Sequence, residues 1–296
     1  MPNFSEGRSQ RVIDGLVAAL QQPAGVACLD RSADASHHRC VITLAGPADA
    51  LVEAAMAGAR QAVRSIDLRA HRGCHMRMGA LDVCPFVPLA GESEAAAVRA
   101  AHQLGARLAE ELELPVYVYG LAARRSERRV LGHVRNLEFE QLRERVGSDP
   151  ALGPDYGPHR LHPSAGAVAV GARHILVAYN IVLTTGDVAL ARRIARDVRA
   201  SDGGIQGVQA RGFLLEASGQ AQVSMNLLGP RHPSLVEVFD RVVAMAQRSG
   251  VDVAKSELVG LAPRAVLTAA AAAHVRLRGY DPAAQVLEER LAACGL

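Results

Sequence analysis

Ala70-His-Arg-Gly-Cys-His-Met-Arg-Met-Gly-Ala-Leu-Asp-Val-Cys-Pro-Phe86 is the stretch on which the interpretation of this chain depends. Its first half gathers two imidazoles, two guanidinium groups and a thiol around two glycines, and its second half is an apolar strand. Gly73 and Gly79 each weaken a helix by about 1 kcal/mol relative to alanine, so a loop is favoured. Loops that enter a strand end commonly carry catalytic groups. The stretch therefore predicts a functional loop attached to a sheet.

The residues before and after this loop alternate between helical and strand patterns. Apolar positions at helical spacing, after an N-cap serine, predict a first helix between Ser5 and Leu20. Strands are expected at 26–30, 39–45, 82–89 and 115–119, and further helices at 47–66 and 93–113. This order predicts an α+β sandwich, with a largely antiparallel sheet and helices on one face. Residues 120–158 are rich in Arg and Glu and predict a surface segment with one polar helix.

A second unit with a similar order of strands and helices is expected to begin near His174. Strands are predicted at 175–183, 207–215 and 220–228 and helices at 187–200 and 233–249, and residues 252–261 lead into an alanine-rich helix from Pro263. The Glu-Ala-Ser-Gly turn between the second and third of these strands is typical of a hairpin. Two such sandwiches placed side by side would leave a groove between them.

Composition limits the class of protein. The 296 residues are 49% hydrophobic, which is enough for a large core, and the apolar run from Ala265 to Ala273 is far short of the roughly 20 residues of a membrane span. The N-terminal segment lacks a signal-peptide pattern, so we expect a cytoplasmic protein that does not bind membranes. Five scattered cysteines predict free thiols. A net charge of +3 with 3% aromatic residues gives little support for nucleic-acid binding.

Five separated motifs, in the same order along the chain, resemble the glutamate formimidoyltransferase family, whose members are also called formiminotransferases. Besides the stretch from Ala70 to Phe86, they are Pro2-Asn-Phe-Ser-Glu-Gly7, the segment from Asp155 to Arg173, Gln222-Val-Ser-Met-Asn-Leu227 and Glu257-Leu-Val-Gly-Leu-Ala-Pro263. The resemblance covers essentially the whole chain. It is similar to the free-standing bacterial form rather than to the animal form, which carries a fused cyclodeaminase domain.

The resemblance implies a fold and a reaction. The fold would be two ferredoxin-like α/β sandwich subdomains, residues 1–174 and 175–296, side by side with an electropositive substrate tunnel between them, in a homodimer. The reaction would move a formimidoyl group between N-formimidoyl-L-glutamate and tetrahydrofolate in histidine degradation and one-carbon metabolism. Tetrahydrofolate would be a co-substrate, and no metal is expected.

The resemblance also assigns roles to residues. The second histidine of the family's His-x-Gly-x-His-Pro-Arg motif is catalytic, and it falls on His75. Asp34, His37, Arg39 and Arg77 would bind the substrate. The family's folate-contacting segment falls on Gly157, Pro158, His159, Arg160, Leu161, His162, Pro163, Ser164, Ala165 and Gly166.

These assignments agree with the chemistry that the reaction needs. Attack of the pterin N5 on the amidine carbon builds a tetrahedral centre. One imidazole whose pKa lies near neutral pH can take up the proton and return it. The formimidoyl amino acid and the glutamate tail of folate carry carboxylates, for which Arg39, Arg77 and Arg160 would be suitable partners. A Gly-rich segment lets main-chain groups approach a flat pterin closely.

Three departures from the family pattern cluster at this site. Cys74 replaces a polar residue, Met76 replaces the proline that normally follows the catalytic histidine, and His38 stands where asparagine is usual. The proline would have fixed its own φ and restricted its predecessor, so Met76 removes a restraint on His75. The departures leave three alternatives: the same chemistry with a different amine, a non-catalytic folate-binding homologue, or a redox or metal-sensing role for Cys74.

Several residues also have less specific explanations. His71 either orients His75 or caps the following strand, and His37 and His38 fit a solvated turn as well as an active-site loop. A zinc ion held by His71, Cys74, His75 and Cys84 would match no established spacing. Gly203 and Gly204 lack the lysine of a phosphate-binding loop, so a helix C-cap explains them better.

Overall fold

The computed structural model describes residues 1–73, 75–89, 91–216, 218–229 and 232–296. Packing of the backbone divides the chain into two compact units, Met1–Arg173 and His174–Leu296. Each unit has its own core of buried aliphatic and aromatic side chains. The tunnel expected between the two units stays a prediction.

The sheet of the first unit has the strand order β2-β3-β1-β4-β6-β5. Its strands are β1 (Asn3–Phe4), β2 (Ala27–Asp34), β3 (Arg39–Ala45), β4 (Leu81–Phe86), β5 (Val116–Gly120) and β6 (Val168–Ala172). β1 pairs antiparallel with both β3 and β4, whereas β6 runs parallel to β4 and to β5. The sheet is therefore mixed: the predicted antiparallel pairing holds from β2 through β3 and β1 to β4, and it fails at β6.

The error follows from β6, a strand that the sequence reading did not assign. β6 is the short run Val-Ala-Val-Gly-Ala, and every one of its residues is buried. A strand buried on both faces shows no alternation of polar and apolar residues, so its pattern does not distinguish it from other apolar segments. Because β6 lies between β4 and β5, it sets the parallel half of the sheet.

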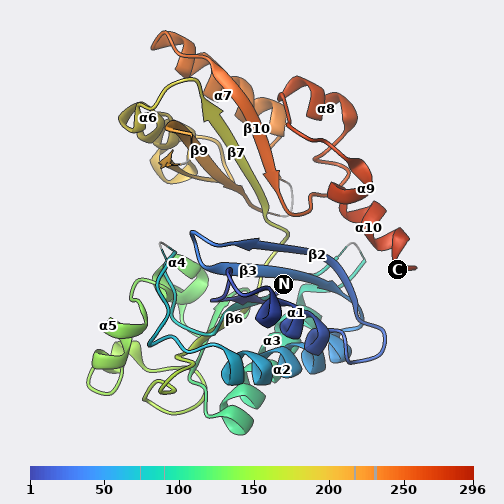
Figure 1. The fold of residues 1–296 in the computed structure, drawn as a ribbon, viewed down its shortest axis with the longest axis vertical. Helices are drawn as coiled ribbons and strands as arrows, with labels where there is room; N and C mark the ends of the chain where they lie inside the picture. Colours follow the sequence, from blue (N-terminus) through green and yellow to red (C-terminus); the bar gives the residue numbers. More distant parts are fainter. Residues whose placement is uncertain (74, 90, 217, 230–231) are drawn as a thin grey trace. The chain divides into compact units, whose positions relative to one another are not determined.

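Three helices, α1 (Gln10–Leu20), α2 (Ala48–Ser65) and α3 (Glu94–Leu112), cover one face of this sheet, as predicted (Figure 1). The cap of α1 is Ser9, whose hydroxyl accepts the backbone N–H of Val12. Ser5 instead donates its hydroxyl to the backbone carbonyl of Gly79, 2.7 Å away. This hydrogen bond connects the N-terminal segment to the loop between α2 and β4. The polar segment after β5 holds α4 (Leu131–Val134), α5 (Phe139–Arg145) and 3₁₀ turns at Ser126–Arg129 and Pro150–Leu152.

The second unit is built on an antiparallel sheet with the order β10-β7-β9-β8. Its strands are β7 (Val177–Leu183), β8 (Val208–Leu215), β9 (Gln220–Leu227) and β10 (Val253–Val259), and the predicted hairpin is formed by β8 and β9. The helices are α6 (Val188–Val198), α7 (Leu235–Arg248), α8 (Ala269–His274), α9 (Pro282–Gln285) and α10 (Leu287–Ala293). The α+β class is confirmed for both units.

Two local expectations in the second unit have clear outcomes. The alanine-rich helix begins at Ala269 rather than near Pro263, because Thr268 caps it by accepting the backbone N–H of Ala271 at 3.1 Å. Gly203 ends the 3₁₀ turn Ala200–Asp202 in the left-handed conformation, with φ of 86°, which is a capping role. In the described parts of the chain no helix combines the length and the apolarity that crossing a bilayer requires.

Candidate functional site

The histidine loop, defined here as residues 67–80 between α2 and β4, is not helical in its described residues, in agreement with its glycines. Three backbone hydrogen bonds of 2.9 Å attach it to the end of the predicted folate segment. Leu68 N–H donates to Ser164, Ala80 N–H donates to Ala165, and Met78 accepts from Ala167 N–H. Both ends of the loop are therefore attached to residues 164–167 through the backbone.

Two glycines make this close approach feasible. A Cβ on Gly79 would lie 1.8 Å from the carbonyl oxygen of Ala167, and a Cβ on Gly166 would lie 2.1 Å from that of Met78. Gly166 also has a φ of 72°, which other residues seldom adopt. These positions accept only glycine without a shift of the backbone.

His71 connects the loop to the turn between β2 and β3. Its buried ring donates from Nε2 to the carbonyl of His38 at 3.0 Å and accepts at Nδ1 from Nε of Arg77 at 3.1 Å. Because a guanidinium only donates, this pattern fixes a neutral ring with its proton on Nε2. The ring also stacks on that of His38, with 4.1 Å between centroids. Burial lowers the pKa of both histidines.

Arg77 is almost completely buried, and its guanidinium donates to the side chains of His71, Glu138 and Glu140. Its Nη1 donates to Glu138 and Glu140 at 3.0 Å, and its Nη2 donates to Glu140 at 2.7 Å. Glu138 is the N-cap of α5 and Glu140 lies in its first turn, where carboxylates are favourable. The predicted role of Arg77 in binding substrate stays a prediction, while the observed contacts place it as the link between His71 and α5.

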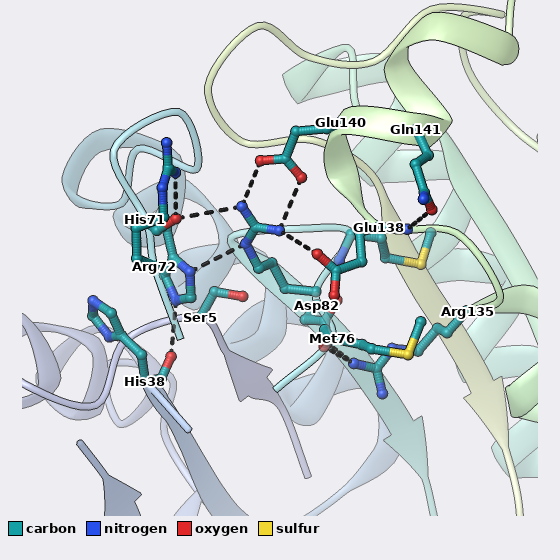
Figure 2. A network of polar contacts seen from close by, with 12 residues as sticks. Ser5, His38, His71, Arg72, Met76, Asp82, Arg135, Glu138, Glu140 and Gln141 are labelled. Carbon is teal, nitrogen blue, oxygen red and sulfur yellow. Dashed lines mark hydrogen bonds and ion pairs between the residues drawn. The ribbon is translucent and has the colours of Figure 1, made fainter. Parts of the chain in front are cut away.

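Asp82 and Arg135, which the sequence analysis did not single out, hold the backbone of the histidine loop. Asp82 accepts the backbone N–H groups of Met78 and Gly79 at 2.8 and 3.3 Å, and its other oxygen lies 2.7 Å from Nη2 of Arg135. Arg135 also donates to the carbonyl of Met76 (Figure 2). A carboxylate inside the otherwise apolar strand β4 was the available signal, since a buried charge requires a partner.

His75 is half-buried and lies at the end of an arginine side chain from β3. Its Nε2 is 2.8 Å from Nη1 of Arg39, and Arg39 also donates through Nη2 to Asn3. Because the guanidinium has no lone pair to offer, Nε2 of His75 is the acceptor and the neutral ring carries its proton on Nδ1. His75 and Arg39, which the sequence predicted separately as catalytic and substrate-binding, are thus in direct contact.

The surroundings of His75 disfavour its charged form. Burial, followed by the positive charges of Arg39 and Arg135, lowers the pKa of His75 to about 3, against a hydrogen bond to the Met76 backbone that favours protonation. The ring of His37 is tilted towards His75 at 6.1 Å between centroids. In this state the imidazole is neutral at physiological pH.

Asp34 is the last residue of β2, and His37 lies on the exposed turn that follows it. The carboxylate of Asp34 accepts the backbone N–H of His37 at 2.7 Å and lies 3.0 Å from its ring Nδ1. His38 closes the turn with a φ of 52°. His37 is exposed on this turn, with its ring centroid 6.1 Å from that of His75, whereas the ring of His38 is stacked on His71. The alternative of a solvated turn therefore fits His37 but not His38.

The predicted folate segment, Gly157 to Gly166, divides into two parts. Residues 164–166 contact the histidine loop, whereas Gly157 is packed against the carbonyl of Leu114, which a Cβ would approach to 2.6 Å. Between them lies a hollow of about 390 Å³, lined by Glu111, Leu112, Glu113, Arg160, Leu161, His162 and Pro163. Arg160 pairs with Glu113 at 2.8 Å in solvent. The structure brings only the last part of this segment next to the loop of His75.

Among the described residues, no group of three or more His, Cys, Asp or Glu side chains is placed to hold a metal ion. Cys74 lies outside the described residues, so the zinc alternative and the sensor alternative that involve it are not tested. The expectation of no metal stays a prediction.

The fold and the site together define a two-subdomain transferase of the formiminotransferase type, and the chain belongs to that family. Residues 1–173 match the family described as "Formiminotransferase domain, N-terminal subdomain", and residues 178–288 match "Formiminotransferase domain". The resemblance recognised in the sequence is confirmed.

Particular relatives extend the comparison along the whole chain. It is 42% identical to the glutamate formimidoyltransferase of Streptococcus pyogenes serotype M1, over 98% of this chain and 97% of the relative. The glutamate formimidoyltransferase of Thermoplasma acidophilum is 39% identical over 98% and 96%. The formimidoyltransferase-cyclodeaminase of Gallus gallus is 42% identical over 93% of this chain, which spans 52% of that longer relative.

Proposed function

We propose that this protein is a glutamate formimidoyltransferase, which moves a formimidoyl group between N-formimidoyl-L-glutamate and tetrahydrofolate. The observation that carries the proposal is the identity of 42% and 39% to two proteins of that name, over nearly the full length of all three chains. The activity belongs to histidine degradation and one-carbon metabolism, with tetrahydrofolate as co-substrate.

The chemistry requires one proton to change places. Nitrogen N5 of the pterin forms a bond to the amidine carbon, and the bond from that carbon to the glutamate nitrogen then breaks. The attacking nitrogen loses a proton and the departing amine gains one. An imidazole can accept the first proton and deliver the second, and we assign this role to His75.

The remaining predicted residues divide by their observed contacts. Arg39 reaches His75 directly and is the strongest candidate for a carboxylate of the amino-acid substrate, with Asp34 and His37 on the neighbouring turn. Residues 157–166 are assigned to folate, because their last part shares backbone hydrogen bonds with the histidine loop. Arg77 holds the loop through Glu138 and Glu140.

The alternative of a folate-binding protein without catalysis came from Met76 and Cys74. Met76 is 40% exposed, and its carbonyl is held by Arg135, so a hydrogen bond restrains the backbone next to His75 where the family has a proline. This observation favours retained catalysis over loss of activity. The same chemistry with a different amine remains the second candidate.

An activity assay separates these candidates. Purified protein with N-formimidoyl-L-glutamate and tetrahydrofolate is expected to form 5-formimidoyltetrahydrofolate, detected by the absorbance of the methenyl product after acid treatment. Turnover of another formimidoyl amine at a higher kcat/KM would support the second candidate. Folate binding without turnover of any formimidoyl donor would contradict both enzyme assignments.

We also propose a homodimer located in the cytoplasm, as for a metabolic enzyme acting on small anionic substrates. Light scattering coupled to size-exclusion chromatography measures the mass directly. For a subunit of 31.3 kDa, the expected mass is about twice that value, and a mass of one subunit at micromolar concentration would contradict the dimer.

A further inference from the structure

The charges around His75 do not balance. The positive charges of Arg39 from β3, which contacts the ring at 2.8 Å, and of Arg135 from the segment after α4 both act on it, and the carboxylate of Asp82 in β4 acts on Arg39. Asp82 forms an ion pair with Arg135. In the described structure, the hydrogen bonds of Arg39 go to neutral atoms, the amide oxygen of Asn3 and Nε2 of His75. The cluster is short of one negative charge.

Arg39 also has an unused donor. Its Nε is buried and makes no hydrogen bond to any described residue. A buried N–H of a charged group without an acceptor is costly, and a carboxylate satisfies it better than a neutral group does. The guanidinium is therefore prepared to accept an anionic partner.

Among the described residues near this cluster, the other ionisable groups are neutral or engaged elsewhere. Glu6 accepts the backbone N–H groups of Arg8 and Ser9 at 2.7 and 3.0 Å and lies 3.4 Å from Nδ1 of His38. Cys40 and Tyr119 lie near Arg39, but burial raises the pKa of each to about 12, so both are neutral. Asp34 is engaged with His37 on the exposed turn, and Glu138 and Glu140 are engaged by Arg77.

The consequence falls on His75. Its Nε2 lone pair is occupied by an N–H of Arg39, and the adjacent charges favour the neutral ring. An imidazole in this condition is a weak acceptor for a proton at neutral pH, whereas catalysis is most efficient when the pKa lies near the working pH. The base needs a change in its surroundings before it can act.

We propose that a carboxylate of the amino-acid substrate activates His75 by taking over the guanidinium of Arg39. The new ion pair replaces the hydrogen bond between Arg39 and His75 and leaves Nε2 free for the proton released by the attacking nitrogen. The same proton later passes from Nε2 to the departing amine, so no net proton is gained or lost. The inference rests on the proposed function, because it takes the substrate to be an anionic amino acid.

Thermodynamic linkage makes the proposal measurable without turnover. If a carboxylate binds more tightly when His75 is protonated, the same carboxylate must raise the pKa of His75 by an equal coupling. The probe is L-glutamate, the amino-acid product, on protein labelled with ¹⁵N in its histidine rings. The ring signals are followed by NMR between pH 4 and 8, and His75→Gln identifies the relevant signals.

The expected result has two parts. Without ligand, His75 shows the tautomer protonated on Nδ1 and does not titrate above pH 5. With saturating L-glutamate its pKa rises by at least two units, and L-glutamic acid diamide, which keeps the carbon skeleton but has no carboxylate, produces no rise. An unchanged titration of His75 in saturating L-glutamate would overturn the proposal.

A matched pair of variants assigns the effect to Arg39. In Arg39→Gln the pKa of His75 is expected to be higher by more than one unit without ligand, and L-glutamate is expected to add little. The control Arg31→Gln removes an exposed arginine of β2 that pairs with Asp14 and is expected to keep the wild-type response. A full response in Arg39→Gln would contradict the assignment, and the wild-type titration decides the proposal if that variant does not fold.

The activity assay keeps the two proposals apart. A glutamate-dependent rise in the pKa of His75 without turnover of N-formimidoyl-L-glutamate would remove the proposed function and leave the coupling between Arg39 and His75. Turnover together with an unchanged pKa of His75 would remove the coupling and leave the proposed function.

Discussion

Asp82 and Arg135 form an ion pair of 2.7 Å in which the carboxylate side chain is only 2% exposed and the arginine side chain 14%. The same carboxylate accepts two backbone N–H groups of the histidine loop, and the same guanidinium holds the carbonyl of Met76. One pair therefore holds the backbone of residues 76–79, the segment that directly follows His75.

Replacing Asp82→Asn is expected to destabilise the first unit by about 3 kcal/mol, because loss of one partner leaves the other charge buried without compensation. Urea unfolding followed by circular dichroism measures the change. The control Asp14→Asn breaks an exposed pair with Arg31, and such pairs contribute little. Equal unfolding midpoints for the two variants would show that the buried pair has no special weight.

His75→Ala is expected to lower kcat by about a hundred- to ten-thousand-fold, the usual contribution of general acid and base catalysis, with the affinity for folate retained. The absorbance of the methenyl product after acid treatment measures the rate. His274→Ala, which removes an exposed histidine of the second unit, serves as control and should keep wild-type activity. Undiminished turnover in His75→Ala would remove this residue from its role.

Gly166→Ala should lose more stability than Gly91→Ala, although both glycines have positive φ. The backbone strain of about 1 kcal/mol is common to both changes. At Gly166 the new Cβ also meets the carbonyl of Met78, whereas at Gly91 no described residue other than its chain neighbours lies within 4 Å of the new Cβ. Thermal unfolding of the two variants isolates the cost of the clash, and a larger loss for Gly91→Ala would refute the close approach.

Acid should destabilise the fold through His71. Burial lowers the pKa of His71 below its ordinary value of about 6.5, so the unfolded chain binds a proton more readily than the folded one. The stabilisation is complete above pH 6.5 and is lost as the pH falls from there towards the folded pKa. The free energy of unfolding should thus be lower at pH 5.5 than at pH 7.5.

His71→Gln keeps one donor and one acceptor but cannot titrate. Its free energy of unfolding should depend less steeply on pH than that of the wild type, measured by urea unfolding at both pH values. His133→Gln, an exposed histidine of the same unit, shows how much of the change follows from removing any imidazole. Identical pH dependence in wild type and His71→Gln would exclude His71 as the cause.

The sequence predicted much of the secondary structure and the family of this protein. Apolar spacing placed the main helices and most strands, and the glycines of the histidine loop excluded a helix there. Five ordered motifs identified the family. β6 escaped detection because a short strand buried on both faces carries no alternation.

By itself the sequence determined the family, the α+β class and which chemical groups the histidine loop carries, because periodicity, caps and motifs are properties of neighbouring residues. Only the tertiary structure decided that Arg77 is held by two carboxylates, that Asp82 pairs with Arg135 and that Arg39 occupies Nε2 of His75. Each of these contacts joins side chains from separate elements, and the packing of the sheet determines which distant charges meet. The protonation state of the proposed catalytic imidazole follows from those contacts.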